Sequence, residues 1–153
     1  MYENNARNNL IASRQLSRYT SRVDDSAMSM ETVWCRMVYS DFENMLAPNV
    51  WHAVYEIQYC LEGEVDFTVQ EQCYTVHEGE FLIIPPKVFH STDRVATDTQ
   101  KFVFAFSIES RACYITEVLE SLRQICVYRG GEHLRHLISM MLEYAYIASP
   151  VSG

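Results

Sequence analysis

The residues of this sequence that are best suited to chemistry are two histidines and a glutamate. His52 and Glu56 stand four residues apart, and His90 ends the segment PPKVFH. Residues at even spacing on an extended strand point to the same face, so His52 and Glu56 are predicted to lie on one side of their strand. Two imidazoles and a carboxylate are ligands for a divalent metal (zinc, iron, manganese or nickel), and they can also clamp a polar small molecule. Both uses require a rolled-up sheet that brings the three side chains together.

The segments around these residues are typical of a β-rich domain. Short runs rich in Val, Ile, Tyr and Phe are separated by turns such as Glu62-Gly63 and Glu78-Gly79. Several short strands with frequent turns predict a sandwich or a barrel. The predicted strands are residues 32–39, 53–61, 64–70, 72–77, 80–84 and 101–108.

Alternation along two of these strands separates two kinds of face. In 53–61, one face is made of Tyr55, Ile57, Tyr59 and Leu61. The opposite face is mixed and carries His52, Val54, Glu56, Gln58 and Cys60. In 101–108, one face carries Phe102, Phe104, Phe106 and Ile108, and the other carries Lys101, Val103, Ala105 and Ser107. The mixed face of 53–61 is typical of a barrel interior that holds a polar ligand.

From Arg111 the hydrophobic period becomes that of helices. A first helix is predicted up to about Cys126, and Gly130-Gly131 is expected to end this helical segment. A second helix is predicted from about Glu132 to Ile147. Steps of four and three residues on the second helix predict a dimer seam made of Leu134, Ile138, Met141 and Ala145. A helix packed on its own barrel fits the same pattern, and the sequence leaves this choice open.

Charge and composition narrow the class of protein. The net charge is −8, while residues 1–22 hold four arginines against one glutamate, so a basic arm precedes an acidic body. An acidic body repels a phosphate backbone, and duplex DNA is therefore not expected to bind this chain taken alone. No run approaches 18 consecutive apolar residues, and the polar N-terminus MYENNARNNL is unlike a secretory signal. A cytoplasmic protein without a membrane span is predicted.

The cysteines have no paired spacing, which argues against a disulfide framework and against a zinc–thiolate site. Buried, reduced side chains are predicted for all five: Cys35, Cys60, Cys73, Cys113 and Cys126.

The run from Trp51 to His90 resembles the two motifs of the cupin superfamily, and most closely the N-terminal sensor domain of AraC-type transcriptional regulators. The likeness rests on the following residues: His52, Glu56, the turn Leu61-Glu62-Gly63 and the segment from Gly79 through Pro85 to His90. It extends over about residues 30–147. It implies a mainly β fold, a cupin-like double-stranded β-barrel (jelly roll) followed by two C-terminal α-helices. The implied organisation is a polar arm over 1–30, a barrel over 31–110 and a helical pair over 111–148.

Two positions depart from the pattern of metal-binding cupins. Such cupins usually supply three histidines and one glutamate, and the first histidine would fall at Val50, while Lys87 replaces a glycine before the last histidine. The metal ligands that remain by this resemblance are His52, Glu56 and His90. Among the sensor domains the metal site is often vestigial, and the cavity binds an organic effector.

The resemblance implies a small-molecule effector-binding and dimerisation domain of a bacterial AraC-type regulator, which is not an enzyme. The effector, a sugar by analogy with the family, would touch His52, Glu56, Gln58, Phe67, Phe81 and His90. Such a domain is expected to be a homodimer. It would reach DNA only through a helix-turn-helix domain that is absent from this chain, so the chain is expected to be a fragment of a longer protein.

Two other functions stay open. A stand-alone metal-dependent cupin enzyme, an isomerase or an oxygenase, would use His52, Glu56 and His90 as metal ligands. An interaction protein would have a barrel filled by its aromatic side chains, of which there are ten tyrosines and seven phenylalanines.

Overall fold

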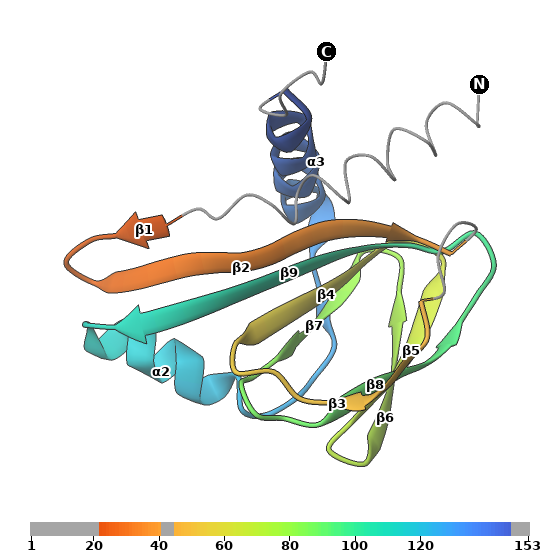
Figure 1. The fold of residues 1–153 in the computed structure, drawn as a ribbon, viewed down its shortest axis with the longest axis horizontal. Coiled ribbons are helices and arrows are strands. Elements are labelled where there is room, and N and C mark those ends of the chain that lie inside the picture. The colour runs from red at the N-terminus through yellow and green to blue at the C-terminus, as the bar shows by residue number, and fades with distance from the viewer. Residues whose placement is uncertain (1–21, 41–44, 148–153) are drawn as a thin grey trace.

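Two antiparallel sheets face each other and are followed by two helices (Figure 1). The computed structural model describes residues 22–40 and 45–147, the last six of these by their backbone alone. Within these residues the larger sheet has six strands in the order β1-β2-β9-β4-β7-β10, and the smaller sheet has four in the order β3-β8-β5-β6. This architecture confirms the predicted β-rich fold with two C-terminal helices.

The larger sheet is made of β1 (Arg22–Asp24), β2 (Met28–Tyr39), β9 (Gln100–Ser110), β4 (Tyr55–Glu62), β7 (Glu80–Ile84) and β10 (Tyr128–Arg129). The smaller sheet is made of β3 (Ala47–Val50), β8 (His90–Val95), β5 (Glu64–Val69) and β6 (Gln72–His77). The helices are α2 (Cys113–Ser121) and α3 (Gly131–Ile147). No helix among these residues is long and apolar enough to cross a membrane.

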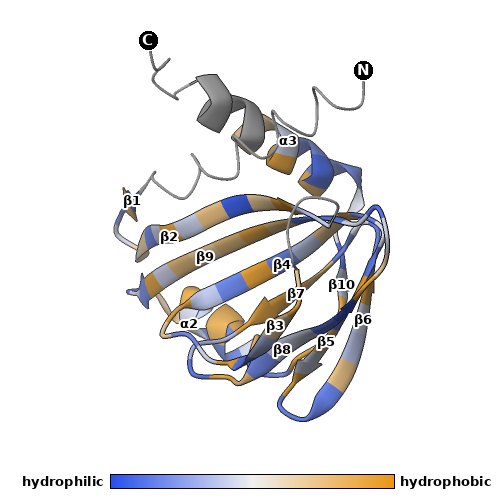
Figure 2. Cartoon of the chain, turned by 45° about the vertical axis from the view of Figure 1, so that its right-hand side comes forward, coloured by the Kyte–Doolittle hydropathy of each residue, from blue (hydrophilic) through white to orange (hydrophobic). Residues whose placement is uncertain are grey.

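The interior between the sheets follows from alternation along the strands, which appears in Figure 2 as changes of colour. On β5, every second side chain is fully buried, while Asp66 and Thr68 face outward and bind neighbouring polar groups. The buried apolar cluster between the sheets consists of Cys60, Val65, Phe67, Val69, Val76 and Leu82. Burying this apolar area is the main source of stability for the barrel.

The outer face of the larger sheet is also apolar, and α3 covers part of it. Ile138 is 4% exposed and Leu134 is half-buried, and both pack against a cluster of Cys35, Met37, Tyr59 and Phe102. The aromatic face of 101–108 is therefore the outer face of the barrel. The predicted dimer seam is wrong for Leu134 and Ile138, because these side chains contact the chain's own sheet. Met141 is exposed, and the side chain of Ala145 lies outside the described residues.

Several element predictions need correction. Residues 22–30, predicted as part of a polar arm, form β1 and the start of β2, whereas residues 1–21 lie outside the described part. The first helix ends at Ser121 instead of about Cys126, because the chain returns to the sheet and adds β10 beside β7. Cys35 and Cys60 are buried, but the cysteine prediction is wrong for three residues that lie on the surface: Cys73, Cys113 and Cys126.

Candidate functional site

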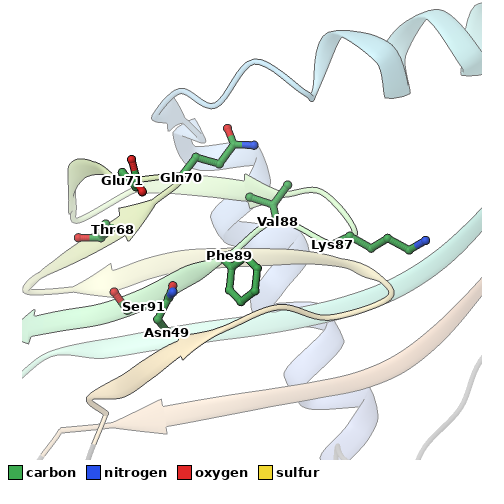
Figure 3. A pocket seen from close by; sticks show the side chains of 8 residues that line it. All are labelled: Asn49, Thr68, Gln70, Glu71, Lys87, Val88, Phe89 and Ser91. Atoms are coloured by element: carbon green, nitrogen blue, oxygen red, sulfur yellow. The ribbon is translucent and has the colours of Figure 1, made fainter.

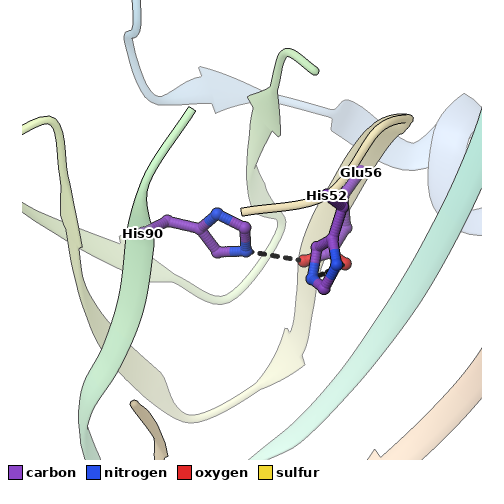
Figure 4. Close-up of side chains that lie close together, drawn as sticks. All are labelled: His52, Glu56 and His90. Atoms are coloured by element: carbon purple, nitrogen blue, oxygen red, sulfur yellow. Dashed lines mark ion pairs between the residues drawn. The ribbon is translucent and has the colours of Figure 1, made fainter. Parts of the chain in front are cut away.

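His52, Glu56 and His90 converge in the structure, as the sequence predicts (Figure 4). Glu56 is the second residue of β4, and His90 is the first residue of β8 on the facing sheet. His52 Nε2 lies 3.6 Å from Glu56 Oε2, and His90 Nε2 lies 3.5 Å from Glu56 Oε1. The three ligand atoms all lie within 4.8 Å of one another. We call these three residues the triad.

The loop before β4 carries His52, so strand parity is the wrong reason for its position. β4 begins at Tyr55, and His52 lies three residues earlier in an irregular segment. The backbone N–H of Lys87 donates to the carbonyl of His52 at 2.7 Å. This bond joins the loop that bears one histidine to the turn that leads into the other, and so it fixes their separation.

Burial and hydrogen bonding set the charges of the triad. Glu56 and His90 are 4% and 5% exposed, whereas His52 is partly exposed and forms the edge of the site. Burial pushes the pKa of Glu56 upward, but hydrogen bonds from His90 and Gln58 outweigh it and hold that pKa below its ordinary value. Burial pushes the pKa of His90 downward, but its bonds to Glu56 and to the Val88 carbonyl raise it above its ordinary value. Without a metal, the two side chains are therefore an ion pair at mildly acidic pH.

The backbone fixes which nitrogen of His90 faces the triad. His90 Nδ1 lies 3.0 Å from the carbonyl oxygen of Val88, which only accepts hydrogen bonds, so Nδ1 carries the proton. In the neutral ring, the lone pair of Nε2 then points toward Glu56. A carbonyl partner of this kind is the usual support for a metal-binding histidine.

The donor set and its spacing fit a divalent metal. Ligands placed tetrahedrally at about 2.1 Å from zinc are about 3.4 Å apart, close to the 3.6 and 3.5 Å that separate the two histidines from oxygens of Glu56. Two histidines and one carboxylate with open positions also form the set used by non-haem iron. The triad residues would hold the ion, and the interior of the barrel would supply its open positions.

Two further side chains border the triad. Gln58 is buried on β4, and its Nε2 donates to Glu56 Oε1. The ring of Trp34 on β2 meets the ring of His52 edge-on, with 5.0 Å between centroids. Gln58 thus lies in the interior as predicted, while Trp34 was not predicted.

The two aromatic ligand candidates differ in position. Phe67 is 1% exposed and lies in the interior cluster. Phe81 is wrong as a ligand-binding residue, because β7 pairs it with Tyr59 on the outer face, where its ring stacks on Tyr128. Lys101 was not predicted as a site residue, but it is buried on the interior face. Its alternation with Val103 and Ala105 could have indicated this position.

A separate open pocket of about 640 Å³ lies on the outer side of the smaller sheet (Figure 3). The side chains that line it are polar except two and come from β3, from β5 and the β5–β6 turn, and from β8 and the segment before it: Asn49, Thr68, Gln70, Glu71, Lys87, Val88, Phe89 and Ser91. None of the triad residues lines this pocket.

A family model described as a cupin domain matches residues 44–107. These residues form a cupin domain. The match spans the segment from before β3 to within β9 and includes the whole triad, so the predicted cupin-like barrel followed by two helices is confirmed. A search of curated proteins found no match.

Solved structures similar to this chain include three from bacteria. KdgF from Halomonas sp. is 14% identical with a TM-score of 0.41, over 56% of this chain and 86% of that chain. An RmlC-like cupin from Shewanella frigidimarina is 17% identical with a TM-score of 0.38, over 56% and 83%. A protein of unknown function from Streptococcus pyogenes is 13% identical with a TM-score of 0.40, over 60% and 75%.

We expect metal affinity and metal-free stability of the cupin domain to respond to pH in opposite directions. Protons compete with a metal for His90, whose pKa is raised, so affinity for Mn²⁺ falls as the pH drops through that pKa. In the metal-free protein, protonated His90 contributes stability below the ordinary pKa of 6.5 and loses it as the pH rises through the raised pKa. Glu56 stays ionised throughout, because its pKa is lowered from 4.5.

Thermal unfolding at about pH 6 and about pH 8, with and without MnCl₂, measures both trends. His90→Gln should remove both trends, and His77→Gln, at an exposed histidine at the end of β6, should keep them. If the metal-free forms of both variants gain the same stability between about pH 6 and about pH 8, this account is wrong.

Proposed function

We propose that the chain binds a small-molecule effector in the interior of its cupin domain, as the sensor and dimerisation domain of a bacterial AraC-type transcription regulator in the cytoplasm. The observation that supports this proposal is the convergence of His52, Glu56 and His90 between the two sheets. Val50 on β3, opposite His90, supplies an apolar side chain where metal-binding cupins resembling this chain have a histidine. An organic ligand would find polar anchors on one side and an apolar wall on the other.

In this proposal the triad positions the effector. Glu56 and His90 are held rigidly by burial and hydrogen bonds, and part-exposed His52 lies where a ligand would enter. A metal bound there would supply an anchor for oxygen atoms of the ligand. The effector would change the regulator only through a difference in affinity between its two states. DNA contact is proposed only through a helix-turn-helix domain of the regulator.

The test is a thermal-shift screen of sugars and sugar acids, followed by calorimetry and by mass spectrometry of the recovered ligand. An effector at one hundred times its Kd should stabilise the protein by about 2.7 kcal/mol. Glu56→Ala should abolish binding, and His77→Ala should leave it intact. Recovery of unchanged ligand supports a sensor. Conversion of the ligand would make the domain an enzyme, and the absence of any ligand response would favour a filled barrel.

We also propose that the domain forms a homodimer through the exposed side of α3. Three large apolar side chains on this side are about 40% exposed: Leu137, Met140 and Met141. Leu137→Lys combined with Met141→Lys should give monomers in sedimentation at unchanged melting temperature, because these side chains contact solvent in the single chain. Ile138→Lys should instead destabilise the fold, since Ile138 is buried against the sheet. A double variant that stays dimeric would contradict the proposal.

A further inference from the structure

The interior of the barrel holds a buried positive charge outside the triad. Lys101, the second residue of β9, is 5% exposed, and its Nζ lies 5.4 Å from the centroid of the Phe67 ring. No carboxylate of the described residues lies within ion-pair distance of this ammonium group. Burial lowers the pKa of Lys101 to about 8, against the opposing influence of Glu56.

Gln58 presents an unpaired acceptor on the same wall. Its Nε2 donates to Glu56, which leaves Oε1 buried without a hydrogen-bond partner among the described residues. If the Gln58 amide were flipped, its Oε1 would face Glu56 Oε1, and two hydrogen-bond acceptors would repel each other. Gln58 stands opposite Val103 and Lys101 stands opposite Cys60 in the β4–β9 pairing, so Gln58 and Lys101 are diagonal neighbours facing inward.

Both groups are unfavourable in the apolar interior. A buried ammonium group without a counter-ion and a buried amide oxygen without a donor each destabilise the fold. A single water molecule could bond to both but would not neutralise the charge of Lys101. Their needs are complementary: Lys101 requires an anion, and Gln58 Oε1 requires an N–H or O–H donor.

We propose that Lys101 and Gln58 form a subsite for a small hydroxy-carboxylate, with the carboxylate on Lys101 Nζ and a neighbouring hydroxyl donating to Gln58 Oε1. This inference rests on the proposed function and names the chemical class of its effector. Arg36 of β2 stands opposite Val103 of β9, and its positive charge also acts on Lys101. The bond from Gln58 to Glu56 joins the subsite to the triad, so further hydroxyls of the same molecule reach His52 and His90.

The test compares hydroxy-carboxylates with the neutral polyols of the same length: glycerate with glycerol, and gluconate with sorbitol. Calorimetry and thermal shift are measured on the wild type, on Lys101→Met and on Arg129→Met, which removes a positive charge that is exposed on β10. At least one carboxylate should bind the wild type and Arg129→Met, while its polyol should bind neither. Lys101→Met should lower the affinity for that carboxylate by about 10- to 100-fold, which is the effect of losing one charge-assisted hydrogen bond. Without ligand, Lys101→Met should melt at a higher temperature than the wild type.

The outcomes separate this inference from the proposed function. If a neutral sugar or polyol binds the wild type and Lys101→Met equally, effector binding stands and the anionic subsite is refuted. If Lys101→Met lowers the melting temperature of the ligand-free protein, the ammonium group already has a stabilising partner within the chain, and the inference fails. If neither neutral nor anionic probes bind the wild type, the proposed function fails with it.

Discussion

Replacing Gly63 by alanine is expected to lower the free energy of unfolding by about 3 kcal/mol, a large fraction of the stability of a small domain. Gly63 joins β4 to β5 with φ +87°, a left-handed conformation that disfavours a side chain. A Cβ atom there would overlap Thr99 Oγ1 and lie 2.8 Å from Thr99 Cα. Thr99 cannot move aside, because it is fully buried and donates from Oγ1 to the Ala96 carbonyl at 2.7 Å.

Gly79 provides the matched control. Its φ is +80°, but no atom lies within 4 Å of the position of its Cβ. Gly79→Ala should therefore lose only the conformational preference, about 1–2 kcal/mol. Urea unfolding of the two variants measures the difference, and equal losses would show that the overlap with Thr99 is relieved at no cost.

Replacing His90 by alanine is expected to lower affinity for Zn²⁺ or Mn²⁺ by at least about 100-fold, since residues that only support metal ligands are already worth 10- to 100-fold. The variant removes one of three donors and also leaves Glu56 buried without its ion-pair partner. Because an uncompensated buried carboxylate destabilises the fold, His90→Gln serves as a second variant that keeps a hydrogen-bond donor.

Calorimetry on metal-free protein near pH 8 measures the affinities. His133→Ala, at an exposed histidine of α3, is the control and should bind metal as the wild type does. Wild-type affinity in both His90 variants would place the ion at surface carboxylates and remove the metal site from the triad.

The strands rich in β-branched and aromatic residues could be predicted from the sequence, and the polar strand β8 could not. β5, β6 and β7 lie within one residue of their predicted bounds, because such residues fill them and the turns Glu62-Gly63 and Glu78-Gly79 separate them from their neighbours. β8 was missed because HSTDRV is polar on both faces: His90 and Thr92 point inward, while Asp93 and Arg94 face solvent. One of its buried polar groups, His90, belongs to the triad, and such a polar cluster overrides the ordinary hydrophobic pattern.

The site was predictable in its residue types but not in its geometry. Alternation along one strand cannot tell which face is inside, and the pairing of Phe81 with Tyr59 decides that Phe81 faces α3. Lys101 alternates with Val103 and Ala105, yet its burial arises from β2 and β4 on either side of β9. Such lateral neighbours come from sheet order, which local sequence does not specify.

The contact between Trp34 and His52 makes tryptophan fluorescence a probe of the triad. The chain has two tryptophans, one touching the His52 ring and the other, Trp51, preceding it in the chain. Indole emission is sensitive to the charge of a neighbouring imidazole. Occupation of the triad should therefore change the intrinsic fluorescence of the unlabelled protein, and Trp34→Phe should remove most of that signal.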